Sequence, residues 1–106
     1  MKERTAEILE ATIQEFIDQG EPVSSGLLHR RHNFGIGPAM IRFELEDLVH
    51  HGFLEQPHHS AGRIPSDKGY EFFAERILDR EPDENYREGK LRDLFVTGAW
   101  DELLHE

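Results

Sequence analysis

Residues 53–70 read FLEQPHHSAGRIPSDKGY. The expected fold depends on this stretch, because it predicts a hairpin attached to the helices that precede it. Residues 53–56 and 63–65 are two short extended pieces, and the small and polar residues between them form a loop, which is the pattern of a β-hairpin. Ser66 and Asp67 can then cap and charge the start of a helix. A hairpin this small is not stable alone, so we expect it to lean on helices.

Helices are predicted on both sides of this hairpin. Apolar residues recur at helical spacing over residues 5–19, and Gly20 ends that helix. A short second helix runs from Ser24 or Ser25 to about residue 32, and a third occupies about residues 38–51. A fourth follows the hairpin. The residues expected to face the core are Ile8, Leu9, Ile13, Phe16, Ile17, Leu27, Leu28, Ile41, Leu45, Leu48, Val49, Tyr70, Phe73, Ala74, Ile77 and Leu78.

The order helix, helix, helix, hairpin, helix predicts one mostly α domain with a small β-hairpin over residues 1–80, a winged helix-turn-helix. The 106 residues are too few for two ordinary domains. The chain has no cysteine, which excludes disulfides, thiolate zinc sites and a cysteine nucleophile. The first ten residues are too charged for a signal peptide, and no apolar run approaches a membrane span. We therefore expect a cytoplasmic protein with no membrane association.

The net charge of −10 is unevenly distributed. Residues 1–21 carry two basic and six acidic side chains, residues 22–70 carry five of each, and residues 71–106 carry five basic and eleven acidic ones. An acidic surface repels a nucleic acid at long range, but the middle of the chain is neutral. It also holds six of the seven histidines, which a phosphate field could protonate. The neutral middle is therefore the candidate for a nucleic-acid contact.

Residues 81–106 are predicted to form a C-terminal helical extension. It is polar at first, and an apolar stripe near its end needs a partner surface. Either two copies pair through this stripe as a homodimer, or it folds back on its own domain. A small domain that binds a palindromic nucleic-acid site gains affinity when two copies pair. We therefore expect two copies. The candidate dimer residues are Leu91, Leu94, Phe95, Trp100 and Leu103.

Three stretches resemble the DNA-binding domain of the HrcA-type heat-inducible transcription repressors. They are EPVSS at 21–25, PAMIR at 38–42 and, above all, PHHSAGRIPSDKGY at 57–70. The resemblance covers about residues 4–78, and its hairpin motif is long and specific. It implies a winged-helix repressor, without a cofactor, that binds an inverted-repeat operator in double-stranded DNA upstream of chaperone genes.

In such modules the second helix of the pair lies in the major groove, and neighbouring elements touch the backbone. Arg42 could reach guanine or a phosphate, or it could pair with Glu46 one turn on. Arg63, in a hairpin segment without acidic residues, could enter the minor groove, or it could be an ordinary surface arginine. His58 could bind phosphate or fix the hairpin against the body. The expected DNA-binding residues are Ser25, Arg30, Arg31, Pro38, Met40, Arg42, Phe43, His58, Ser60, Arg63 and Lys68.

The outer face of the third helix favours an alternative. Where the resembling family has Ser, Thr and Asn around Arg42, this chain has Gly37, Met40 and Phe43. At 100° per residue, the face opposite Ile41 is apolar and acidic, which suits a protein partner, although Met and Phe can also touch thymine methyl groups. The alternative is therefore a winged-helix protein-interaction module that has lost base readout and docks through Met40 and Phe43.

The sequence favours neither a metal-binding protein nor an enzyme. The histidines invite a metal hypothesis, because His29 and His32 share a helix face and His50, His51, His58 and His59 could converge through the hairpin. Their spacings match no metal motif, so we predict no metal. We also predict no enzyme, because the sequence has no nucleophile elbow, phosphate loop or paired carboxylates. Gly62 and Gly69 are interpreted as sites of backbone turns or close packing.

Overall fold

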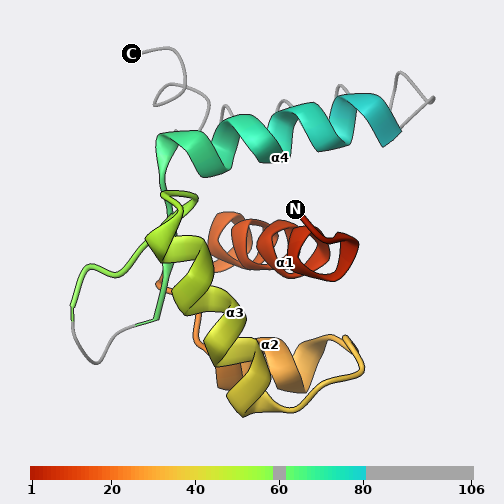
Figure 1. Ribbon diagram of the computed structural model, residues 1–106. Helices are drawn as coiled ribbons and strands as arrows, with labels where there is room; N and C mark the ends of the chain where they lie inside the picture. Colours follow the sequence, from red (N-terminus) through yellow and green to blue (C-terminus); the bar gives the residue numbers. More distant parts are fainter. Residues whose placement is uncertain (59–61, 81–106) are drawn as a thin grey trace.

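The computed structural model describes residues 1–58 and 62–80 (Figure 1). The elements along the chain are α1 (Glu3–Gln19), α2 (Ser25–Arg31), α3 (Pro38–His50), β1 (Leu54–Glu55), β2 (Ile64–Pro65) and α4 (Asp67–Arg80). This order and these bounds confirm the predicted mostly helical fold with a small hairpin. The predicted extension, residues 81–106, lies outside the described residues.

The helices begin and end at the residues whose chemistry favours it. Gly20 adopts a left-handed φ of 73° and donates its amide to the Phe16 carbonyl at 2.7 Å, which closes α1. The hydroxyl of Ser24 accepts from the Leu27 amide at 3.0 Å and caps α2. The hydroxyl of Ser66 accepts from the amide three residues on at 3.1 Å and caps α4. The predicted caps at the starts of α2 and α4 are therefore confirmed.

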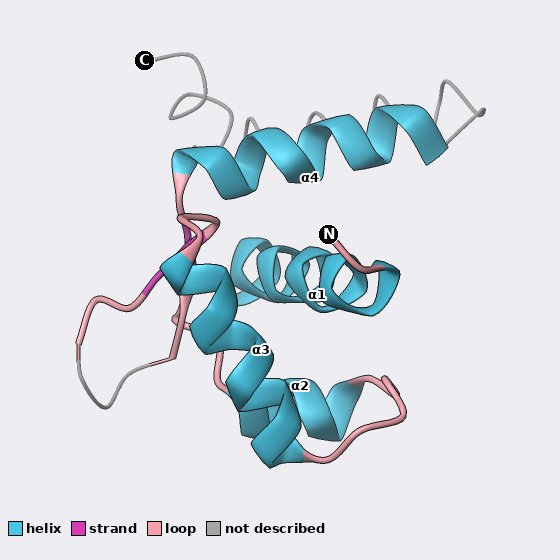
Figure 2. Ribbon diagram, in the orientation of Figure 1, coloured by secondary structure: helices cyan, strands magenta, loops and turns pink. Residues whose placement is uncertain are grey.

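The core forms around α1, which lies between α4 on one side and the α2 and α3 pair on the other (Figure 2). Leu78 is a correction, because the sequence predicts it inside and the structure leaves it 39% exposed. It follows the buried Ile77 directly and so lies at the edge of the apolar stripe of α4. The largest fully buried side chains are Phe73, Ile8, Leu9, Ile13, Leu28, Ile41, Leu45, Leu48, Leu54, Val23 and Thr12.

The hairpin is joined to the helices by a third extended segment. In the antiparallel pair of β1 and β2, Leu54 lies opposite Pro65. Val23, between α1 and α2, then pairs with Arg63, and their two backbone hydrogen bonds measure 2.9 and 2.8 Å. Gly62 permits this approach, since a Cβ there would lie 2.5 Å from the Val23 carbonyl group. The interpretation of Gly62 as a close-packing position is confirmed.

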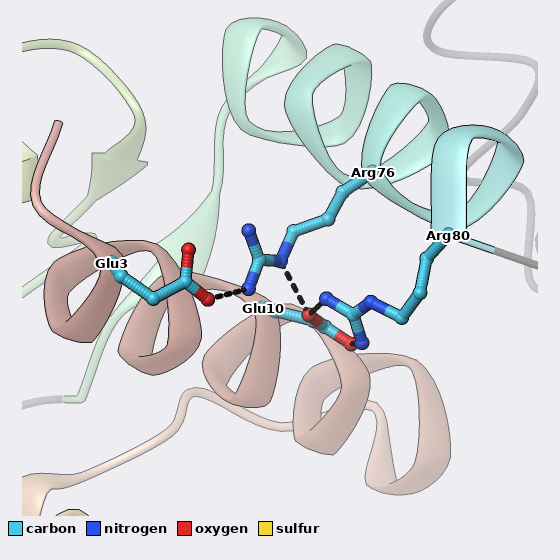
Figure 3. Close-up of polar contacts among 4 residues, drawn as sticks. All are labelled: Glu3, Glu10, Arg76 and Arg80. Carbon is cyan, nitrogen blue, oxygen red and sulfur yellow. Dashed lines mark hydrogen bonds and ion pairs between the residues drawn. The ribbon is translucent and has the colours of Figure 1, made fainter.

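Four charged side chains link α1 to α4 (Figure 3). The Arg76 guanidinium donates to Glu3 and to Glu10, both at 2.6 Å. Arg80 donates to both oxygens of Glu10, at 2.9 Å for one of them. Burial alone would raise the pKa of Glu10, but the hydrogen bonds from Arg80 and Arg76 outweigh it and lower that pKa. Arginines of α4 therefore neutralise two of the six acidic residues near the N-terminus.

We expect Glu10→Gln to reduce the stability of the domain by about 1 kcal/mol near neutral pH. Because folding lowers the pKa of Glu10 below that of an ordinary glutamate, its contribution is fully present above the pKa of the unfolded chain and is lost as the pH falls through the pKa of the folded state. The difference between parent and variant in chemical denaturation should therefore shrink at pH 3. The matched control is Glu7→Gln, at an exposed position of the same helix. An equal Glu10→Gln deficit at pH 3 and pH 7 would contradict this assignment.

Candidate nucleic-acid interface

The outer face of α3 is the most exposed apolar surface of the helix pair. Ile41, Leu45 and Leu48 face the body and are fully or almost fully buried. On the other side of the helix, Met40 is 48% exposed and Phe43 is 66% exposed. Helical spacing alone therefore predicted correctly which face of α3 is buried and which is exposed.

Arg42 lies beside this apolar face, on the side toward the hairpin. Its side chain is 71% exposed, and its Nε atom is 3.6 Å from a carboxylate oxygen of Glu46, itself 55% exposed. The ion pair given above as the alternative for Arg42 is therefore present. An exposed pair of this kind is worth little, so Arg42 can exchange Glu46 for another acceptor at small cost.

Arg63 is a correction to the sequence analysis. The hairpin was expected to present it as an exposed guanidinium, but only 7% of the residue is exposed. Its backbone pairs with Val23, and this draws the side chain against the body. Burial lowers the pKa of Arg63, nearby Arg42 lowers it further and Glu46 opposes them. Arg63 thus lies where the hairpin meets α3, not on an exposed finger.

Arg31 is engaged by an acid that the sequence analysis missed. Glu15 of α1 is buried, and its carboxylate lies 3.2 Å from Nε of Arg31 and 2.8 Å from Nε2 of His32. The available signal was its spacing, because Glu15 follows Ile8 by seven residues and so falls on the inward stripe of α1. Glu15 holds the end of α2 against α1, and Arg31 is one of its two partners in this contact.

Lys68 is also engaged within the fold. Its ammonium group donates to the His51 carbonyl at 3.0 Å and lies 4.4 Å from the centre of the Phe53 ring. A cation at this position satisfies a carbonyl at the end of α3 and complements the helix dipole. The structure therefore gives Lys68 a role in holding α4 to the end of α3.

The remaining predicted contact residues lie at the ends of elements. Ser25 is the half-buried first residue of α2, and Arg30 is exposed near its end. Pro38 is the exposed first residue of α3, and His58 is exposed beyond β1. Ser60 lies outside the described residues, as do the predicted dimer residues Leu91, Leu94, Phe95, Trp100 and Leu103.

A hollow of about 480 Å³ lies beside Phe43, between α3 and the start of α1. Two carboxylates of α3 line it, and one of them, on Glu44, accepts a hydrogen bond from Thr5 of α1 at 2.9 Å. Glu44 and Asp47 therefore lie beside Phe43 at this hollow. The lining residues are Met1, Lys2, Thr5, Phe43, Glu44, Asp47, Leu48, His51 and Phe53.

Residues 1–58 and 62–80 contain neither a cluster of metal ligands nor a membrane-spanning helix. No three His, Asp or Glu side chains in these ranges gather where they could hold a metal ion. Within the same ranges, no helix has both the length and the apolar character needed to cross a bilayer.

The fold is that of a winged helix-turn-helix domain. Its second helix, α3, has an exposed outer face, and the hairpin of β1 and β2 lies beside that helix. The comparisons then identify the family: the chain is a homologue of the N-terminal region of the HrcA heat-inducible transcription repressors. It is 43% identical over 97 residues to the repressor of Clostridium perfringens strain SM101, covering 92% of this chain and 29% of that protein. It is 51% identical over 78 residues to that of Moorella thermoacetica, covering 74% and 23%.

A solved structure supports the same fold. A crystal structure described as that of a hypothetical protein matches 74% of this chain and 25% of its own, with a TM-score of 0.72 and 37% sequence identity. No family model matches the sequence. The chain spans about three tenths or less of the curated relatives named above. The homology thus covers one region of proteins that are described as transcription repressors.

Proposed function

We propose that this domain binds double-stranded DNA as a sequence-specific transcriptional regulator, in keeping with relatives that are described as transcription repressors. The observation that carries the proposal is the outer face of α3, which is open to solvent along the second helix of a winged helix-turn-helix. An α-helix of this kind fits the major groove. Three of the acids elsewhere, Glu3, Glu10 and Glu15, are paired with arginines and histidine of the body.

We divide the predicted contact residues into two groups. Arg31, Arg63 and Lys68 form contacts inside the fold, and we assign them to positioning α2, the hairpin and the end of α3. The rest we propose as direct contacts, with the start of α2 and the hairpin on the backbone and α3 on the bases. These contact residues are Ser25, Arg30, Pro38, Met40, Arg42, Phe43, His58 and Ser60.

The wider proposal is a cytoplasmic repressor that acts as a homodimer on an inverted repeat. It is supported by the sequence pattern of residues 81–106 and by the gain in affinity when two small domains share a site. The test is selection of bound sequences from a random duplex pool with the purified chain. An enriched inverted repeat supports sequence-specific binding by a dimer, a single enriched half-site removes the dimer, and no enrichment overturns the assignment of DNA binding.

We expect Arg42→Ala and Arg63→Ala to have opposite signatures. Arg42→Ala should leave the melting temperature unchanged, relax preference at one base pair and make affinity less dependent on salt. Arg63→Ala should lower stability by about 1–2 kcal/mol, because it removes a buried stem, and should leave the salt slope unchanged. Thermal melts and salt titrations on the selected duplex measure both. If Arg63→Ala altered the salt slope, Arg63 would instead be a residue that contacts the DNA backbone.

The second candidate function is a protein-interaction module that uses Met40 and Phe43. The observation that favours it is the exposure of both side chains, together with the hollow beside Phe43. Salt dependence separates the two functions, because affinity through phosphate contacts falls steeply with salt whereas apolar docking changes little.

A further inference from the structure

We propose that Met40 and Phe43 recognise the 5-methyl groups of thymine in the major groove. This inference rests on the proposed DNA binding and specifies what the outer face of α3 recognises. Phe43 follows Met40 by three residues and Ala39 by four, so its side chain lies beside both of theirs on the surface of the helix. All three are exposed, and Phe43 is the most exposed large apolar side chain of the described residues.

The charges around this face direct it to bases instead of phosphates. Glu46 and Asp47 are exposed on the next turn of α3, and carboxylates there repel the DNA backbone. In the major groove, a carboxylate can instead accept from the amino group of cytosine, and an apolar side chain can contact the thymine methyl group. Arg42, at the edge toward the hairpin, remains available for guanine or a phosphate. The face therefore has the chemistry of base edges.

The size of the patch favours the same target. A stable protein interface buries roughly 800 Å² on each partner. Two side chains that are 48% and 66% exposed, with one alanine beside them, supply only a small part of that area. A thymine methyl group is a target of matching size, because one side chain can cover it. Removing a single methyl-sized contact should weaken binding about fourfold.

The experiment uses the full chain and the duplex enriched from the random pool. Each thymine in that duplex is replaced, one at a time, by deoxyuridine, which removes only the 5-methyl group. The parent chain should bind about fourfold more weakly when one or two particular thymines are replaced. At the same positions, Phe43→Ala or Met40→Ala should bind the thymine and uracil duplexes equally. Leu78→Ala, which shortens another exposed apolar side chain on α4, is the matched control and should keep the full penalty.

The outcomes separate this inference from the proposed function. If a sequence is enriched but uracil is equivalent to thymine everywhere, DNA binding stands and methyl recognition is overturned. A penalty that persists unchanged in both Phe43→Ala and Met40→Ala overturns it too. If no duplex is enriched, both proposals fail and the protein-interaction candidate remains. Because both side chains are exposed, the variants should melt like the parent, so a changed affinity reports on binding.

Discussion

Gly69→Ala should lower the free energy of unfolding by about 3 kcal/mol, a large share of what a domain of this size has. Gly69 is buried in the first turn of α4, and a Cβ there would lie 2.2 Å from the Phe53 carbonyl oxygen. That oxygen accepts the Ser66 amide at 3.2 Å, so the clash is with backbone that already holds the start of α4. Relief requires α4 to move away from the segment that enters the hairpin. Denaturant melts of the two proteins measure the loss.

Gly26→Ala is the matched control because it makes the same change in another helix. A Cβ at Gly26 would meet only the flexible end of Arg30 at 3.5 Å and the Ser24 hydroxyl at 3.9 Å. Alanine is favoured over glycine in a helix, so the control should be neutral or slightly stabilising. If Gly69→Ala and Gly26→Ala gave the same stability, the close approach of α4 to Phe53 would be wrong.

The local features of this fold could be predicted from the sequence because short-range rules govern them. Ser24 and Ser66 cap helices, Gly20 ends one and Pro38 begins one, and each follows from the chemistry of a single residue and its neighbours. The buried and exposed faces of α3 follow from its period.

Contacts between residues far apart in the chain could not be predicted in the same way. Glu10 meets Arg76 and Arg80 across 66 and 70 positions, and periodicity cannot say which exposed charges a packed fold brings together. Arg63 illustrates the consequence. Its neighbours in sequence predicted an exposed hairpin arginine, but pairing with Val23, forty residues earlier, buries it. The sequence therefore predicted correctly which face of α3 is exposed, but it did not predict that Arg63 is buried.

Substitutions of Phe43 by charged residues should separate the two candidate functions most strongly. Phe43→Glu places a third carboxylate one turn before Glu46 and Asp47 and should weaken binding to a random duplex about tenfold. Phe43→Lys removes the same ring but adds a cation, so it should strengthen binding to that duplex and steepen its salt dependence by about one phosphate contact. Titrations of labelled random duplex at two salt concentrations measure both effects, and thermal melts confirm that each variant folds.

The sign of the Phe43→Lys effect identifies the partner because both variants lose the aromatic ring. A partner protein that docks on the ring loses its anchor in either variant. Apolar docking therefore predicts that Phe43→Glu and Phe43→Lys weaken binding to that protein alike. Phosphates near α3 discriminate between the charges, so DNA predicts opposite changes. The control is the same pair of substitutions at Leu78, on α4, where neither should change DNA affinity by more than the long-range effect of one charge. If neither Phe43 variant changed affinity for the random duplex by more than the Leu78 controls do, α3 would be removed from the DNA interface even if the chain still bound duplex elsewhere.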